Sequence, residues 1–372
     1  MLPAPRHDER GRQEFVSALR SHLAARLAPG NYAVYRERAE PRFAREHGRP
    51  PATRHEVRAA MEQEPAYQFW SALQRRSQEM LWEASIDPTE RQLPALIARA
   101  RRAGRRGPRG RRPGTLRLDP TLVVPRYHTA VDIHLQPGGY HTDFVADDVA
   151  AGAVYDRGLN LYSAGSMGPR NEYLGDLLLA FALGRDPGQS PRRILDMGCG
   201  IGNSTLPWAR RFPGAEVHAI DVAAPQLRYG HARAEAFGVS VHFSQQNAER
   251  TGFAAGSFDL VVSHIMLHET SRTALPRILA ESRRLLRPGG LMLHLEIPRG
   301  RGPLEQFLYN WEVWNNNETF AGWITDADLA ALARRAGFAA RDVECVDHAV
   351  QRERDQRIYS QETYWKILMA RR

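Results

Sequence analysis

The chain has 372 residues, of which 42% are apolar and 25% are charged, and its formal net charge is +9. This length exceeds one minimal domain, and the apolar content is sufficient for a buried core. The absence of any run of about eighteen apolar residues excludes a membrane-spanning helix. The first thirteen residues are polar and lack the apolar core of a signal peptide, so we expect a cytoplasmic protein.

The positive charge is concentrated in one segment. Nine arginines and no acidic residue lie between Arg99 and Arg117, and they equal the net charge of the whole chain. Glycine and proline are dense in residues 104–118, so we interpret this segment as an exposed linker. It contains no aromatic side chain on which a base could stack, and nucleic acid is therefore not an expected partner.

Residues 1–103 predict a helical N-terminal region. Apolar side chains recur at helical spacing near the start, and again in residues 65–85 and 91–102. The region has no recognisable motif. We expect it to act as a cap over an active site, and its helices are also a candidate homodimer surface.

Residues 119–189 predict a cap or substrate-binding segment. Residues 121–135 are expected to contain a strand, and residues 136–139 a turn. Residues 147–183 are expected to be helical, with a break at residues 165–169.

Residues 190–372 alternate regularly between strand and helix. The expected strands are 193–197, 215–220, 239–244, 258–263, 290–296, 339–347 and 359–371, and the expected helices are 203–212, 224–237, 273–286 and 325–336. Strands that alternate with helices indicate a parallel sheet, and the last strand is expected to be antiparallel. The predicted fold is α/β: a Rossmann-like, seven-stranded, mostly parallel sheet with a helical N-terminal cap region.

A glycine-rich turn follows the first of these strands. Gly198, Gly200 and Gly202 stand directly after it, and Asp221 ends the next strand. Glycine lets the backbone approach a ligand closely because it has no Cβ, and a carboxylate at the end of the second strand can bind ribose hydroxyls. The pattern predicts a nucleoside-type cofactor. Cys199 lies inside this turn, so a disulfide with Cys345 is not expected.

Four sequence blocks carry a family resemblance. They are residues 196–202 (DMGCGIG), 218–221 (HAID), 258–269 (FDLVVSHIMLHE) and 285–291 (LLRPGGL). In this order and spacing, residues 190–372 resemble the class I S-adenosylmethionine-dependent methyltransferases that act on small molecules. A nicotinamide-dependent enzyme is the weaker alternative, because its glycine spacing differs and it has no use for the last block.

The resemblance implies a role for each cofactor residue. The three glycines would lie under the methionine and ribose portions of S-adenosylmethionine, and Asp221 would bind the ribose hydroxyls. Asn247 stands where the family usually has aspartate beside the adenine, and an amide oxygen preserves the acceptor. The other implied cofactor residues are Asp196, Ala248 and His264.

A general base is needed where the acceptor must lose a proton. The expected catalytic residues are His264 at the end of the fourth strand, Glu172 at a helix start, and His141. His268, Glu269 and Tyr155 are further candidates, although structural roles are equally compatible with the positions of His264, His268 and Glu172.

Aromatic residues predict the acceptor pocket. We expect Tyr140, Tyr155, Trp311 and Trp314 to line it, the last two from an aromatic insert at residues 299–323 that could also form a small core. His134, His141 and Asp143 could form a two-histidine, one-carboxylate metal site. Chance clustering of loop histidines is more common, so no metal is expected.

These features predict methyl transfer from S-adenosylmethionine to a small-molecule acceptor, in specialised metabolism. One alternative is an enzyme on the same fold that uses the cofactor without methylation, by cofactor cyclisation or ring closure. A second alternative is an RNA or protein methyltransferase recruited by the arginine-rich segment, whose binding would fall steeply with salt.

Overall fold

A computed structural model describes residues 1–104, 114–349 and 364–372. Most of the segment interpreted as a linker, and residues 359–363 of the last expected strand, lie outside the described residues. No helix among the described residues combines the length and apolar character that a membrane crossing requires.

Among the described residues, one eight-stranded sheet organises the chain from residue 115 onward, in the order β1-β4-β3-β2-β5-β6-β8-β7. β8 runs antiparallel to both of its neighbours, as predicted, and the other pairs are parallel. The strands are β1 (Thr115–Arg117), β2 (Arg193–Met197), β3 (Glu216–Asp221), β4 (His242–Gln245), β5 (Phe258–His264), β6 (Leu286–Glu296), β7 (Val343–Ala349) and β8 (Tyr364–Arg371).

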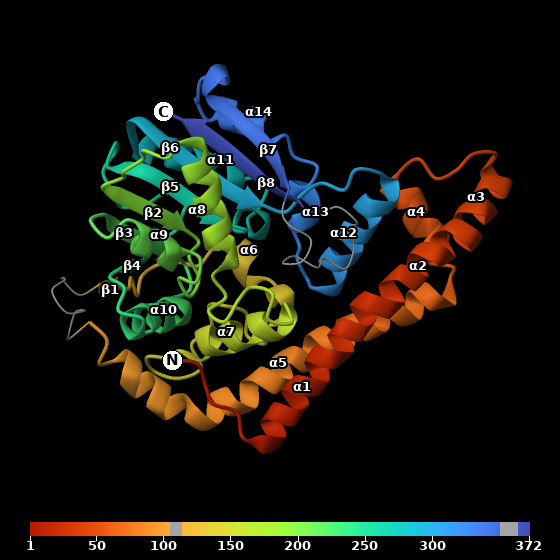
Figure 1. Ribbon diagram of the computed structural model, residues 1–372, viewed down its shortest axis with the longest axis horizontal. Coiled ribbons are helices and arrows are strands. Elements are labelled where there is room, and N and C mark those ends of the chain that lie inside the picture. Colours follow the sequence, from red (N-terminus) through yellow and green to blue (C-terminus); the bar gives the residue numbers. More distant parts are fainter. Residues whose placement is uncertain (105–113, 350–363) are drawn as a thin grey trace.

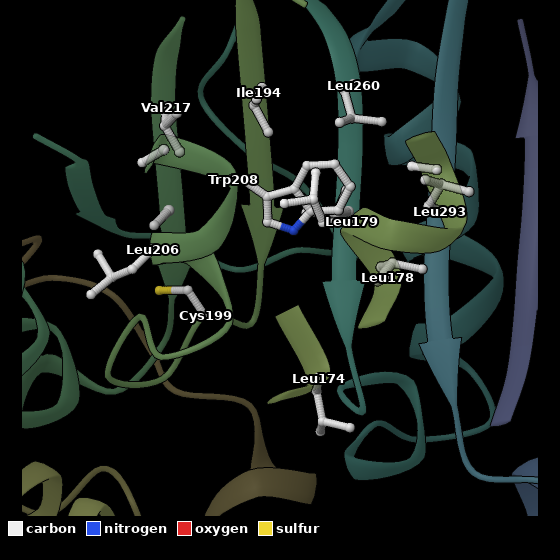
Figure 2. Close-up of a cluster of buried hydrophobic side chains, with 14 of the residues drawn as sticks. Leu174, Leu178, Leu179, Ile194, Cys199, Leu206, Trp208, Val217, Leu260 and Leu293 are labelled. Atoms are coloured by element: carbon white, nitrogen blue, oxygen red, sulfur yellow. The ribbon is translucent and has the colours of Figure 1, made fainter. Parts of the chain in front are cut away.

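Helices cover both faces of the sheet. One face packs against α8 (Tyr173–Arg185), α9 (Thr205–Arg211) and α10 (Ala224–Ala236), and the other packs against α11 (Ala274–Leu285) and α14 (Leu329–Arg335). Figure 2 shows Trp208 of α9 over the strand residues Ile194 and Leu260, where it is fully buried. Because both faces are covered, the central strands are mainly apolar, which is why their positions could be predicted from the sequence.

The sheet has one strand more than the seven that the sequence predicted. The additional strand is β1, which extends the sheet edge beside β4. Gly114 permits this approach, because a Cβ there would lie 2.4 Å from the backbone oxygen of Val241. The strand expected in residues 121–135 is absent, and the segment instead contains α6 (Arg126–Thr129) and the 3-10 turn η3 (Ile133–Leu135). Pro120 and Pro125 cannot donate to a strand ladder, which explains the error.

The N-terminal region is helical, as predicted. Helix runs without interruption from His7 to His47 through α1 (His7–His22), η1 (Leu23–Leu27), α2 (Ala28–Val34), η2 (Tyr35–Ala39) and α3 (Glu40–His47), where η1 and η2 are π-helical turns. α4 (Arg54–Met61) and α5 (Pro65–Ala100) follow. These helices form an elongated layer beside the sheet domain, with α7 (Ala150–Tyr162) next to α5 (Figure 1).

α5 joins two segments that were expected to be separate helices, and it does so across two internal prolines. Pro88 has no N–H to donate to the backbone oxygen of Ala84. The side-chain amide of Gln13, from α1, donates to that oxygen at 2.9 Å and replaces the missing bond. Leu81 and Leu96, which lie on either side of Pro88 in the sequence, are both buried, and this packing favours a continuous helix.

The aromatic insert after β6 forms α12 (Pro303–Asn315) and α13 (Ala321–Ile324). Phe307, Leu308 and Trp311 of α12 are buried in one cluster with side chains of α2, α3, α4 and α5. Trp311 stacks on Trp70 with ring centroids 3.7 Å apart. The insert therefore forms the small core shared with the N-terminal helices that was one of its two interpretations. The remaining 3-10 turns are η4 (Leu267–Glu269) and η5 (Ala340–Asp342).

Candidate active site

The turn after β2 is tied to the end of β3. Asp221 accepts the backbone N–H of Gly200 through Oδ2 and that of Ala223 through Oδ1, both at 2.9 Å. The carboxylate thus fixes the conformation of the glycine turn and remains beside it. This brings Asp221 and the glycines together, as the sequence pattern predicted.

The glycines of the turn have different surroundings. All three have positive φ, a region that other residues rarely adopt. At Gly198 a Cβ would lie 2.1 Å from Cγ of Met266, so this position is packed against the protein. At Gly200, with φ of 51°, no heavy atom of the described residues lies within 4 Å of an added Cβ. The space in front of Gly200 is therefore open to a ligand.

Asp196 and His264 lie behind the turn. Asp196 accepts the hydroxyl of Thr205 at 2.6 Å, and its other oxygen is 3.4 Å from Nδ1 of His264. The indole N–H of Trp208 donates to Nε2 of His264 at 3.3 Å. His264 is buried in these contacts and is not part of the cavity wall described below, so its position does not support the expected role as a base.

Asn247 and Ala248 follow β4. The side-chain oxygen of Asn247 accepts the backbone N–H of Glu249 at 2.9 Å, which forms a local turn. A carbonyl oxygen has a second lone pair, so the residue keeps acceptor capacity for a ligand.

A cavity of about 1120 Å³ lies between the sheet domain and the N-terminal helices. Ile265 and Ile297, which directly follow β5 and β6, belong to its wall, so the cavity begins where the central strands end. Tyrosines are the most conspicuous component of the lining, which includes Tyr32, Tyr140, Tyr155, Tyr162 and Tyr309, together with Trp82, His134, His268, Glu312 and Glu318.

Two of the four predicted pocket residues reach this cavity. Tyr140 and Tyr155 line it and form an edge-to-face pair with centroids 5.5 Å apart. Burial raises the pKa of both phenols, and the negative charges of Glu269 and Asp221 add to the effect.

Trp311 and Trp314 do not line the cavity. Trp311 is in the core against Trp70, and Trp314 is 38% exposed, with the guanidinium of Arg58 over its ring at 3.8 Å. Because the two tryptophans are three residues apart in α12, both side chains lie on the side of the helix that meets the N-terminal helices, and neither faces the cavity. Residues between them, such as Glu312 and Val313, do.

The other two expected catalytic residues also lie outside the cavity wall. Glu172 forms an ion pair with Arg210 of α9, which satisfies its charge. His141 packs near His128, with ring centroids 5.7 Å apart, and burial lowers its pKa. Asp143 pairs with Arg228 at 2.7 Å, so the structure does not assemble the metal set of His134, His141 and Asp143.

A different polar cluster forms one side of the cavity, which we call the cavity floor: His134, His268 and Glu318 belong to the wall, and Glu269 and Glu296 contact these histidines. Nε2 of His134 is 3.3 Å from Oε1 of Glu269, and Nε2 of His268 is 4.0 Å from the same oxygen. Nδ1 of His268 contacts Glu296 at 2.8 Å, and Nδ1 of His134 is 3.4 Å from Glu318.

The charges within this cluster shift the pKa values of His268 and Glu269. Burial by itself lowers the pKa of His268, but the carboxylate of Glu296 outweighs this and raises it to about 9. Burial likewise favours the neutral form of Glu269, yet His134 and His268 lower its pKa. The sequence did not predict that His134 lies beside His268 and Glu269, because His134 is far from the other two residues in the chain.

A methyltransferase-domain family model matches residues 194–290. A demethylmenaquinone methyltransferase of Thermus thermophilus is 37% identical over 110 residues, which are 30% of this chain and 49% of the relative. A methyltransferase of Synechocystis sp., itself uncharacterized, is 31% identical over 160 residues, or 41% of this chain and 68% of the relative. This chain belongs to the class I S-adenosylmethionine-dependent methyltransferases.

Among solved structures, phosphoethanolamine N-methyltransferase 2 of Haemonchus contortus, in complex with S-adenosyl-L-methionine, aligns with a TM-score of 0.46 and 21% identity. The alignment covers 58% of this chain and 57% of the Haemonchus contortus chain. The chain spans about half the length of the Thermus relative.

The residues of the turn fit the cofactor of this family, S-adenosylmethionine. Gly200 presents bare backbone to an open space that a Cβ would fill, and the Asp221 carboxylate is held beside it. A nucleoside with two ribose hydroxyls requires this combination of close approach and a paired acceptor.

Proposed function

We propose that this methyltransferase transfers the methyl group of S-adenosylmethionine to a small-molecule acceptor bound in the cavity. The observation that carries the proposal is the position of the cavity. Its wall includes Ile265 and Ile297, at the carboxyl ends of β5 and β6, and ligands bind at this edge in open α/β sheets.

The cofactor half of the site follows from the turn. Gly198, Gly200 and Gly202 would lie under the methionine and ribose portions, and Asp221 would accept the ribose hydroxyls. Bound S-adenosylmethionine supplies an electrophilic methyl group on a sulfonium. Other residues proposed for this half are Asp196, for the methionine amino group, and Asn247 and Ala248, for the adenine.

The acceptor half favours a planar, aromatic substrate. Five tyrosines and Trp82 supply ring faces and edges, and the carboxylates of Glu312 and Glu318 supply hydrogen-bond acceptors. The volume, about 1120 Å³, holds a molecule of metabolite size. A hydroxylated aromatic ring matches this lining, and the Thermus relative is named for a quinone-type substrate.

The first experiment is calorimetric titration with S-adenosylmethionine, comparing the wild-type protein with Asp221→Ala. Loss of two charge-assisted ribose bonds, each about 1.5–3 kcal/mol, lowers affinity about 100-fold or more. Asp347→Ala, on the exposed side of β7, removes the same charge and should bind normally. Asp221→Asn keeps the side-chain volume and separates loss of charge from damage to the turn.

The second experiment identifies the product by mass spectrometry after incubation with hydroquinone and catechol acceptors. S-adenosylhomocysteine together with a methylated acceptor supports the proposal. Methylthioadenosine formed without acceptor would instead indicate cofactor cyclisation, and methylated RNA or protein would indicate a macromolecular substrate. Failure of the wild-type protein to bind the cofactor would refute the proposal.

A further inference from the structure

The cavity floor holds two histidines and one carboxylate in ligand geometry. One nitrogen of His134, one of His268 and one oxygen of Glu269 all lie within 4.8 Å of one another. Two ligand atoms bound to the same ion at about 2.1 Å, in tetrahedral arrangement, lie about 3.4 Å apart. The measured separations from Glu269, 3.3 and 4.0 Å, are close to that value.

The opposite nitrogens of both imidazoles face other carboxylates. Nδ1 of His268 contacts Glu296, which is fully buried, and Nδ1 of His134 faces Glu318. Histidines that bind metals usually have their second nitrogen oriented by a carboxylate in this way. Glu296 is itself fixed, because it also accepts the backbone N–H of Leu267 at 2.7 Å.

The backbone holds His134 in an unusual conformation. Its φ is 55°, in the left-handed region that non-glycine residues rarely adopt. Trp82 and Gln78 donate to its backbone oxygen at 2.6 and 3.0 Å, and they fix the residue in place. Strain of this kind persists where the surrounding structure enforces it, and it is concentrated at functional sites.

We propose that His134, His268 and Glu269 bind a divalent transition-metal ion at the floor of the cavity. Two imidazoles and one carboxylate suit Zn²⁺, Fe²⁺ or Co²⁺ better than Mg²⁺, which prefers oxygen ligands. His134 and His268 belong to the cavity wall, so the remaining coordination positions of the ion face the bound acceptor. There the ion would hold an acceptor oxygen and lower its pKa.

The test uses untagged, full-length protein, freed of metal with a chelator and titrated with Zn²⁺ by calorimetry. We expect one Zn²⁺ per chain. His134→Gln, His268→Gln and Glu269→Gln should each weaken binding by about 100-fold, and Glu296→Gln by about 10–100-fold through loss of orientation. His141→Gln, from the same segment as His134 but outside the cluster, is the matched control and should bind Zn²⁺ within about threefold of wild type.

Co²⁺ provides a second measurement, because its visible absorption reports coordination. Bands that appear at one equivalent in wild type and His141→Gln, and that are absent in His268→Gln, support the site. Circular dichroism is used to check that each variant is folded. The proposal fails if Zn²⁺ does not bind, or if the three ligand variants bind it as wild type does; the cluster is then an ion-pair network without a metal. No S-adenosylmethionine is present, so this outcome is independent of methyl transfer.

Discussion

The substitution Gly200→Ala tests whether Gly200 faces the bound cofactor. The comparison is with Gly198, a glycine of the same turn that packs against the protein. The added methyl group enters the open space in front of the turn, where it meets no described atom within 4 Å. The cost to folding is therefore confined to placing alanine at positive φ, about 1–2 kcal/mol. S-adenosylmethionine would meet the methyl group directly, so we expect its affinity to fall about 100-fold, or about 2.7 kcal/mol.

Gly198→Ala is the contrasting variant. Its methyl group would lie 2.1 Å from Cγ of Met266, so overpacking adds about 1–3 kcal/mol to the conformational cost. We expect a total loss of about 2–5 kcal/mol in the free energy of unfolding.

Urea unfolding and calorimetric titration of both variants measure the two effects separately. The reasoning is refuted if Gly200→Ala binds the cofactor as wild type does, because the open space would then not be the cofactor's. It also fails if Gly200→Ala is destabilised as strongly as Gly198→Ala.

Three further predictions concern stability, each measured by urea unfolding. Trp311→Ala should cost about 3–5 kcal/mol because it empties a stacked core site, whereas the exposed Trp314→Ala should cost less than about 1 kcal/mol; equal losses would contradict the assigned positions. Gln13→Leu conserves the side-chain volume but leaves the backbone oxygen of Ala84 in α5 without a donor, so we expect the free energy of unfolding to fall by about 1–3 kcal/mol. An unchanged free energy of unfolding would show that the Gln13 amide does not compensate for the hydrogen bond that Pro88 cannot make. Burial alone would raise the pKa of Glu281, but hydrogen bonds and Arg284 lower it below its usual 4.5, so the stability that its charge contributes is present above pH 4.5 and is lost as pH falls through the lowered pKa. Glu281→Gln should therefore differ from wild type less in acid than at neutral pH, and a constant difference would refute the linkage.

Local patterns predicted the sheet domain well because its signals are local. The buried strand at residues 193–197, the glycine turn and Asp221 lie within about thirty residues, and each has a periodicity or a spacing of its own. The last strand follows its neighbour closely in the sequence, which predicts an antiparallel pair, and the pairing of β8 confirms this.

The cavity could not be predicted in the same way. Trp311 and Tyr155 are both aromatic residues in helices, and no local pattern distinguishes the core position from the cavity position. His134 meets His268 through long-range packing of η3 against α5, not through spacing. The sequence predicted separate helical segments at residues 65–85 and 91–102, and it could not show that the helix continues through Pro88, because the compensating donor, Gln13, is contributed by a different helix.

The two halves of the site have different origins in the chain. The residues proposed for the cofactor all lie between positions 196 and 248, whereas most of the cavity wall comes from the N-terminal helices, α7 and α12. On the proposed function, substitutions in those helices reshape the choice of acceptor without altering the cofactor turn. The N-terminal layer is then the part of the chain to exchange when a different acceptor is sought.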